Sequence, residues 1–183
     1  NTTALYGNDL STFPDFPAEI RAPQGTLAGV SGFQISFGST EVFTPGDECD
    51  VLVVMNVAAL KANLKRLKKQ GTVILNLDGF DKRNLRLAGI DEDQNPLNDN
   101  SLADYRVIDM NVTKQTRECL SDVSIGVKEK DRCKNMFVLG FIYWMYNRSL
   151  EHTISFLNEK FSNKIDILES NIKVLKAGYN FAN

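Results

Sequence analysis

Residues 50–77 read DVLVVMNVAALKANLKRLKKQGTVILNL and decide the fold. They contain two apolar, β-branched runs, residues 50–55 and 72–77, separated by an amphipathic segment. A continuous apolar run of this kind is typical of a strand that is covered on both faces, as strands in parallel sheets are. We therefore expect two parallel strands joined by a crossover that contains a helix.

The segment between the two strands has the signals of a helix. Asn56 stands where an N-cap residue is needed, and Gly71 is placed to end the helix. The apolar stripe recurs at helical spacing, at Val57, Leu60, Leu64 and Leu67. Since ligands of open α/β sheets bind at the carboxyl ends of the strands, function is expected near Asn56 and Asp78.

The sequence before residue 50 predicts further strands. Residues 9–13 form a short strand candidate that Pro14 closes. Residues 32–37 alternate between apolar and polar side chains, which is typical of a half-buried strand, and residues 41–44 are expected to pair with them as a hairpin.

The chain after this unit predicts one more strand and then helices. Residues 80–100 read as an irregular polar segment, and residues 105–110 as a strand. Thr113 is expected to cap a helix that runs toward Leu120. Residues 133–146 are apolar on nearly all sides and predict a buried helix, and two amphipathic helices follow over residues 150–161 and 165–179. The fold class is therefore α/β, with helices concentrated in the C-terminal third.

Composition excludes several classes of protein. The chain has 183 residues, of which 43% are hydrophobic, and its net charge is −2. This balance gives no reason to expect a nucleic acid or an anionic membrane as partner. The longest apolar run, residues 136–146, is shorter than the roughly 18 residues that a membrane span needs. The sequence shows no secretory leader, so we expect the cytoplasm as its location.

Few residues are candidates for chemistry. The three cysteines, Cys49, Cys119 and Cys133, fit no metal-binding spacing and are expected to be small buried hydrophobes. The single histidine, His152, falls in an amphipathic helix and is expected to be a surface or partly packed residue. Neither a Walker loop, a G-x-G-x-x-G turn nor a G-x-S-x-G elbow is present in this sequence. We predict no catalytic residue and no metal site.

One loop has the residues of a binding site. Between Pro17 and Pro23 lie Glu19 and Arg21, and Gln24 follows. An arginine can bind a phosphate or a carboxylate through two parallel hydrogen bonds, and a nearby glutamate could orient it. The residues alone leave two readings balanced: a binding edge, or an ion pair within the loop that only shapes it.

Other polar features have simpler explanations. Gly25, Gly29 and Gly32 lead into a strand and are expected to allow tight turns rather than to hold phosphate. The basic residues 65–69 and the acidic residues 91–93 are expected to be solvated surface.

The stretch at residues 11–34, STFPDFPAEIRAPQGTLAGVSGFQ, resembles the gamma domain of 2-oxoacid:ferredoxin oxidoreductases. It is most similar to the gamma region that is fused to the alpha subunit of 2-oxoglutarate:ferredoxin oxidoreductases. The resemblance extends along nearly the whole chain. It includes residues 44–47 with the strand that follows, Lys134-Asn135-Met136 with Leu139-Gly140, and residues 171–179.

The resemblance implies a Rossmann-like three-layer sandwich with a mixed, partly parallel sheet. It implies one gamma-type domain over residues 1–183 that lacks the family's N-terminal strand and glycine-rich turn. Such a domain holds no cofactor alone and supports an oxidative decarboxylation. The complex uses thiamine diphosphate, Mg²⁺, iron–sulfur clusters and coenzyme A. Its partners are the alpha and beta subunits and, indirectly, ferredoxin. Glu19, Arg21 and Gln24 would then line an interface or the coenzyme A side.

An alternative from another class remains open at this point. The same residues fit a free-standing α/β module that binds a ligand or a protein and performs no reaction.

Overall fold

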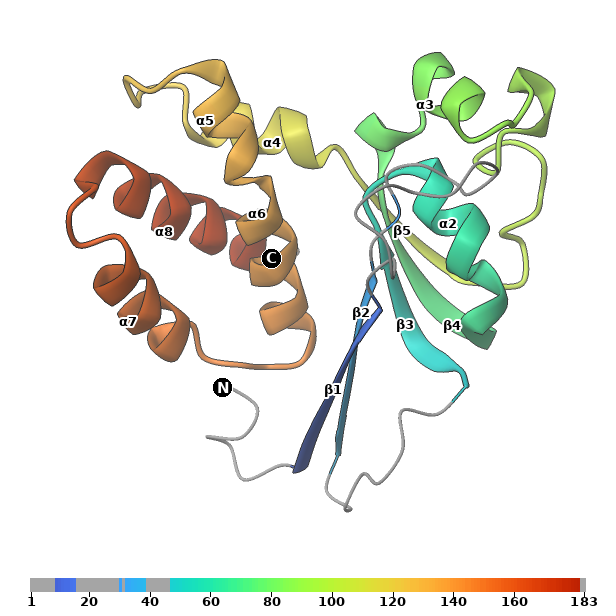
Figure 1. The fold of residues 1–183 in the computed structure, drawn as a ribbon, viewed down its shortest axis with the longest axis horizontal. Coiled ribbons are helices and arrows are strands. Elements are labelled where there is room, and N and C mark those ends of the chain that lie inside the picture. The colour runs from blue at the N-terminus through green and yellow to red at the C-terminus, as the bar shows by residue number, and fades with distance from the viewer. Residues whose placement is uncertain (1–8, 16–29, 31, 39–46, 182–183) are drawn as a thin grey trace. The chain divides into compact units, whose positions relative to one another are not determined.

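The structure, a computed structural model, describes residues 9–15, 30, 32–38 and 47–181 (Figure 1). The chain divides into two compact units at Met110. We call residues up to Met110 the α/β unit and residues from Asn111 the helical unit. The predicted α/β class is confirmed, and the helices are concentrated toward the C-terminus, as expected.

The α/β unit contains both kinds of strand pairing. Its described elements are β1 (Asp9–Asp15), β2 (Gly32–Gly38), β3 (Cys49–Val54), α2 (Val57–Asn63), η1 (Leu64–Arg66), β4 (Leu67–Asn76), η2 (Leu77–Gly79), α3 (Lys82–Leu87), η3 (Glu92–Gln94) and β5 (Arg106–Met110). β1 and β2 form an antiparallel pair, while β3, β4 and β5 form a parallel sheet in that order. The antiparallel and parallel strands thus lie in separate sheets. The predicted hairpin partner of β2, residues 41–44, lies outside the described residues.

The parallel sheet forms as the apolar runs predict. Val73 of β4 lies in register with Leu52 of β3 and Val107 of β5. Val73 and Leu75 are fully buried in a core that also includes Val57 and Leu60 of α2. The helix begins where expected, because the Asn56 side chain accepts a hydrogen bond from the Ala59 N–H at 2.8 Å.

The helix is shorter than the apolar stripe predicts. α2 ends at Asn63, a 3₁₀ turn follows, and β4 begins at Leu67 rather than after Gly71. Leu64 and Leu67 still pack on the same core, so the stripe correctly identifies which residues are buried but not their backbone conformation. The register of β4 against β3 then shifts, and Gln70, at φ 62°, donates its N–H to the Asp104 carbonyl. Tertiary packing has overridden local helix preference here.

The polar segment at residues 80–100 is not wholly irregular. α3 occupies Lys82–Leu87, with Leu85 buried in the core. Asp81 caps this helix by accepting a hydrogen bond from the Asn84 N–H at 2.7 Å. The prediction of an irregular segment is wrong over these residues, because the segment is short and holds too few apolar residues to show a helical period.

The helical unit contains five described helices. These are α4 (Val112–Cys119), α5 (Val127–Arg132), α6 (Lys134–Met145), α7 (Glu151–Lys160) and α8 (Ile165–Asn180). The three C-terminal helices are confirmed. The short, charged α5 was not predicted. Thr113 is not the cap of α4, because the helix already begins at Val112 with Asn111 in the N-cap position.

Two glycines bring α6 and α8 together. A Cβ atom on Gly178 would overlap the Phe137 carbonyl oxygen, and one on Gly140 would overlap that of Leu175. Phe137 and Phe141 of α6 also contact the ring of Phe181 edge-on, at centroid distances of 5.4 and 6.4 Å. Only part of α6 is buried, in contrast to the prediction, because this close crossing covers one side of the helix.

None of the helices in the described ranges is long and apolar enough to cross a lipid bilayer.

Candidate functional site

The predicted site residues Glu19, Arg21 and Gln24 lie outside the described residues, as do Gly25 and Gly29. The structure does describe the strands on either side of them. Asp15, at the end of β1, pairs with Gly32, at the start of β2. The chain that contains these three residues therefore leaves and rejoins the β1–β2 pair at the same end.

The carboxyl end of the parallel sheet, where function was expected, is tightly packed. Asn76, at the end of β4, is 3% exposed, and its side-chain N–H donates to the Met55 carbonyl at 3.2 Å. Gly79 lies so close to this carbonyl and to the Asn56 Cα that a Cβ atom would overlap both. These contacts hold the ends of β3 and β4 together. Because the Asn56 side chain caps α2, it is engaged in a structural contact.

A depression of about 540 Å³ lies beside this end of the sheet, along β5. Apolar residues such as Leu77, Leu97 and Val107 line it, together with the polar Asn98, Asn100 and Asp109. Asp109 is exposed and is the only charged residue among the described residues of this lining. Asp78, the other expected residue, is exposed but does not line the depression.

Sequence reasoning missed this depression. It brings β5 together with a loop that precedes the strand; the irregular segment and the strand were each predicted, but not that they pack against each other. The clearest local signal is the turn-rich sequence NPLNDN at residues 95–100, in which Asn100 has φ 62°. That signal predicts a loop without showing what the loop lies against.

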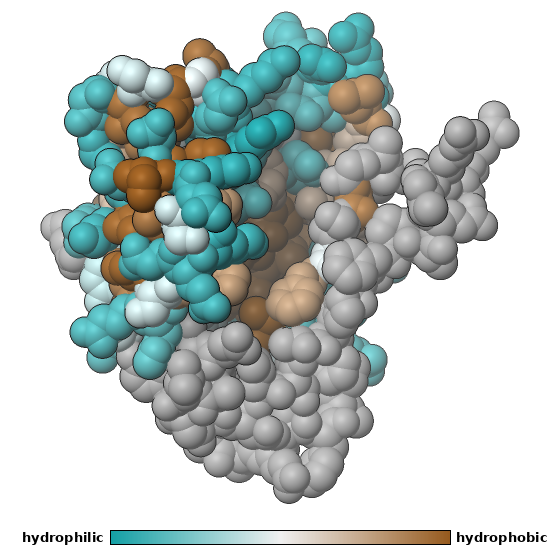
Figure 2. Space-filling view, turned by 60° about the vertical axis from the view of Figure 1, so that its left-hand side comes forward, coloured by the Kyte–Doolittle hydropathy of each residue, from teal (hydrophilic) through white to brown (hydrophobic). Residues whose placement is uncertain are grey.

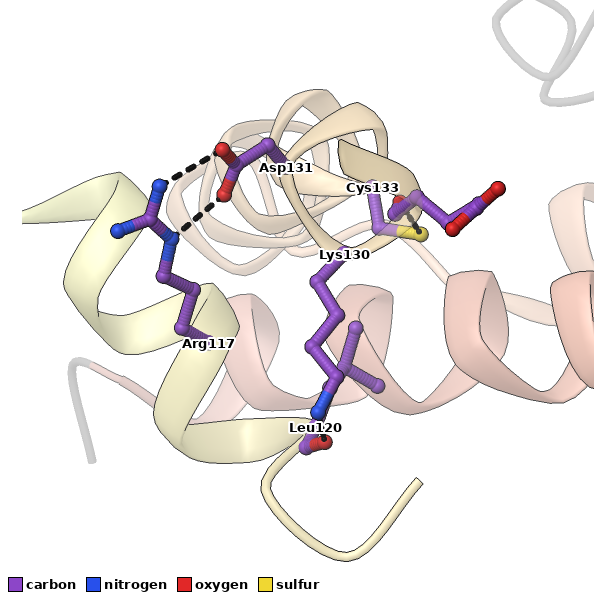
Figure 3. Close-up of polar contacts among 6 residues, drawn as sticks. Arg117, Leu120, Lys130, Asp131 and Cys133 are labelled. Carbon is purple, nitrogen blue, oxygen red and sulfur yellow. Dashed lines mark hydrogen bonds and ion pairs between the residues drawn. The ribbon is translucent and has the colours of Figure 1, made fainter. Parts of the chain in front are cut away.

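The helical unit has a polar cluster between α4 and α5 (Figure 3). Arg117 donates two hydrogen bonds to the Asp131 carboxylate, both at 2.7 Å. The Lys130 ammonium donates to the Leu120 carbonyl at 2.6 Å, just beyond the end of α4. The hydrogen bonds from Arg117 lower the pKa of Asp131. Arg117, Asp131 and Lys130 each make a hydrogen bond within the unit, so these contacts join α4 and α5.

The cysteines lack the features of reactive thiols. Cys133 is 3% exposed, and Cys49 and Cys119 are half-buried. Burial raises the pKa of each thiol, which disfavours the nucleophilic thiolate. The prediction that the cysteines are small buried hydrophobes is thus confirmed for Cys133, while Cys49 and Cys119 are only half-buried.

The described ranges offer no donor set for a metal. No three His, Cys, Asp or Glu side chains gather there as metal ligands would. His152 is exposed on the first turn of α7, as predicted.

Apolar side chains also reach the surface of the helical unit. Val127 is 60% exposed, Phe156 52% and Ile165 55%. Figure 2 shows hydrophobic side chains, coloured brown, among hydrophilic ones on this unit. Isolated exposed apolar residues are common on proteins and by themselves indicate no site.

Comparison with known proteins identifies relatives along the whole chain. Residues 2–181 match the family described as pyruvate ferredoxin/flavodoxin oxidoreductase. A curated relative, the 2-oxoglutarate oxidoreductase subunit KorA of Mycobacterium tuberculosis, is 49% identical over 178 residues. The match covers 97% of this chain and 27% of that subunit, so the chain spans about a quarter of the length of this relative.

Two solved structures share the fold. The 2-oxoglutarate:ferredoxin oxidoreductase from Magnetococcus marinus, with 2-oxoglutarate, coenzyme A and succinyl-CoA bound, matches with a TM-score of 0.69 and 22% identity. That match covers 99% of this chain and 27% of the other. The gamma subunit of a keto/oxoacid ferredoxin oxidoreductase from Geobacter sulfurreducens matches with a TM-score of 0.54 and 13% identity, over 97% of this chain and 85% of that one.

Proposed function

Since the chain belongs to the pyruvate ferredoxin/flavodoxin oxidoreductase family, we propose that it is the gamma-type part of a 2-oxoacid:ferredoxin oxidoreductase. The 2-oxoacid we propose is 2-oxoglutarate. The observation that carries this proposal is the 49% identity with the KorA subunit over 97% of this chain. The complex would oxidatively decarboxylate the 2-oxoacid in the cytoplasm, transfer the acyl group to coenzyme A and pass electrons to ferredoxin.

The relative lengths support a gamma-type domain. The chain spans 27% of each of the two 2-oxoglutarate enzyme chains but 85% of a separate gamma subunit. We propose that the α/β unit and the helical unit together constitute one such domain. The remaining parts, which correspond to alpha and beta, are its partners.

The chemistry of the described side chains fits a supporting role. An iron–sulfur cluster requires several cysteine thiolates close together. Here Cys49 belongs to the α/β unit and the other two cysteines to the helical unit, and no described group of three potential ligands exists. The described residues thus do not fit a cluster. We propose that thiamine diphosphate, Mg²⁺ and the clusters are held by the alpha and beta parts.

For coenzyme A we propose a role for the loop that begins after β1. Arg21 would donate paired hydrogen bonds to a phosphate of coenzyme A or to a carboxylate across the interface, oriented by Glu19 and with Gln24 beside it. The pairing of Asp15 with Gly32 supports this, because it fixes both ends of the loop on a paired scaffold.

The test is reconstitution with the thiamine-dependent alpha and beta polypeptides. The complex should oxidise 2-oxoglutarate in the presence of coenzyme A, and this chain alone should bind no thiamine diphosphate and turn over no 2-oxoacid. Oxidation of a 2-oxoacid by the chain alone would refute the proposal.

A substitution separates the role of the loop from that of the fold. Arg21→Ala should weaken assembly or raise the KM for coenzyme A by about tenfold or more, since a charged hydrogen bond is worth roughly 1.5–3 kcal/mol. Arg83→Ala, on the exposed part of α3, is the matched control and should change neither quantity. Unchanged assembly and kinetics in Arg21→Ala would assign that residue a local structural role.

A further inference from the structure

In the described strand order β3-β4-β5, β5 lies at one end of the parallel sheet. Resting on the proposed function, we propose that an extended segment of a partner polypeptide in the complex adds to this edge as a further strand. The segment places an apolar side chain beside Val107 and, two residues along, a lysine or arginine beside Asp109.

Within the part of the chain that the structure describes, no strand pairs with the outer edge of β5. β5 is the last strand in the order β3-β4-β5, so β4 pairs with it on one side. Along the described chain, no backbone–backbone hydrogen bond reaches the other side of Arg106–Met110. An unpaired strand edge presents a row of N–H and C=O groups that an extended peptide can use, and this is a recurrent mode of peptide recognition.

The side chains of β5 define what the segment must carry. Val107 is in register with the buried Val73, and Asp109 with the buried Leu75, so both lie on the face of the sheet that packs against the core. Yet Val107 is 41% exposed and Asp109 is also exposed. The apolar row of the sheet therefore continues to its edge and is left uncovered there.

The depression beside β5 provides space for the side chains of the segment. It holds about 540 Å³, and its lining includes the apolar Leu77, Leu97 and Val107. Among the described residues, its charged lining is Asp109 alone, with no lysine or arginine. A phosphate-bearing ligand would meet the negative charge of Asp109 there, whereas a basic side chain would find a partner. Because side chains on one face of a strand recur every two residues, the apolar and basic positions of the segment must also be two apart.

A second copy of this chain does not meet that requirement. In an antiparallel pair, residues that lie opposite each other point to the same face of the sheet. If two copies of β5 paired about a twofold axis perpendicular to the sheet, odd-numbered residues would face odd-numbered ones. Asp109 would then lie opposite Tyr105, Val107 or another Asp109, and none of these is basic. The charge pattern thus favours a different polypeptide.

Photo-crosslinking in the assembled complex tests the proposal. Val107 is replaced by p-benzoylphenylalanine, a photoreactive residue, and mass spectrometry identifies the peptides that it captures. Leu87, which is 66% exposed on α3, is replaced in the same way as a control. We expect capture at position 107, but not at position 87, of a partner segment in which an apolar and a basic residue stand two apart.

Other crosslinking results would overturn the proposal. Capture of a second copy of this chain, or of no partner segment, would exclude strand addition by a partner while leaving the proposed function intact in an active complex. If the wild-type chain forms no complex with thiamine-dependent polypeptides, both proposals fail.

A charge reversal provides a second measurement. Asp109→Lys should weaken assembly about tenfold at low salt, since it places like charges together at the interface, and this loss should diminish as salt screens the repulsion. Asp93→Lys makes the same change at an exposed residue outside the depression and should alter assembly by less than about twofold. Equal effects of the two variants would contradict a contact at Asp109.

Discussion

In the α/β unit, side chains fill the space between a parallel sheet and short helices, whereas in the helical unit two helices meet at positions that lack a side chain. Val73 and Leu75 point from β4 into a core shared with α2. By contrast, Gly140 and Gly178 allow the backbones of α6 and α8 to approach until neither could accept a methyl group. The packing of the α/β unit depends on where apolar side chains stand. The packing of the helical unit also depends on the two positions where glycine has no side chain.

The difference extends to the backbone edges and the polar contacts of the two units. In the described residues, β5 ends the parallel sheet and pairs with β4, while β1 and β2 form a separate antiparallel pair. In the helical unit, polar pairs such as Arg117 with Asp131 join neighbouring helices, while the buried Thr116 hydroxyl has no hydrogen-bond partner among the described residues.

The largest expected effect is at the helix crossing. Gly178→Ala should reduce the free energy of unfolding of the helical unit by about 3 kcal/mol, because the new methyl group would overlap the Phe137 carbonyl, which is fixed backbone. The fluorescence of Trp144, the single tryptophan, reports this in a urea titration.

Gly126→Ala is the matched control in the same unit. Its methyl group would meet only the end of the Glu129 side chain, which can move away, so the change should stay within about 0.5 kcal/mol. Equal losses of stability in Gly178→Ala and Gly126→Ala would show that the stability of the helical unit does not depend on the close approach of α6 and α8.

The next effect sharpens the comparison within the α/β unit. Gly79→Ala should cost about 2 kcal/mol, because a Cβ atom there would overlap the Met55 carbonyl and the Asn56 Cα. Hydrogen exchange of the β3 and β4 amides measures it. Gly89→Ala has open space but φ 61°, and should cost only about 1 kcal/mol. A larger loss of stability in Gly89→Ala than in Gly79→Ala would contradict the close packing at the ends of β3 and β4.

The smallest effect concerns the polar pair of the helical unit. Asp131→Asn should cost about 0.5–1 kcal/mol at pH 7, since the pair is partly exposed. Because Arg117 lowers the pKa of Asp131 in the folded state, this contribution is fully present above the unfolded pKa of about 3.9 and is lost as pH falls through the lower folded value. Urea titrations of wild type and variant should therefore converge as the pH falls below the lowered folded pKa of Asp131.

A weaker ion pair serves as the control for that measurement. Lys114 and Glu118 lie 3.9 Å apart on the surface of α4, and Lys114→Ala should change stability by less than about 0.5 kcal/mol. A pH-independent loss in Asp131→Asn would show that shape rather than charge holds α4 and α5 together.

Much of the α/β unit could be predicted because its signals are local. The β-branched runs at residues 50–55 and 72–77 predict buried parallel strands. Asn56, as an N-cap residue, predicts where the helix that follows it begins. The candidate residues Glu19, Arg21 and Gln24 stay a prediction. The depression beside β5 could not be predicted, because it depends on how the loop of residues 96–103 packs against a strand that follows it.

Periodicity and capping in the sequence determined the α/β class and the two parallel strands at residues 50–55 and 72–77, since they act over a few neighbouring positions. The resemblance of residues 11–34 indicated the family. Only the tertiary structure decided that α2 stops at Asn63, that the antiparallel and parallel strands form separate sheets, and that Gly140 and Gly178 each face a carbonyl on the opposite helix. These features depend on contacts between residues far apart in the chain, and no local pattern encodes such contacts.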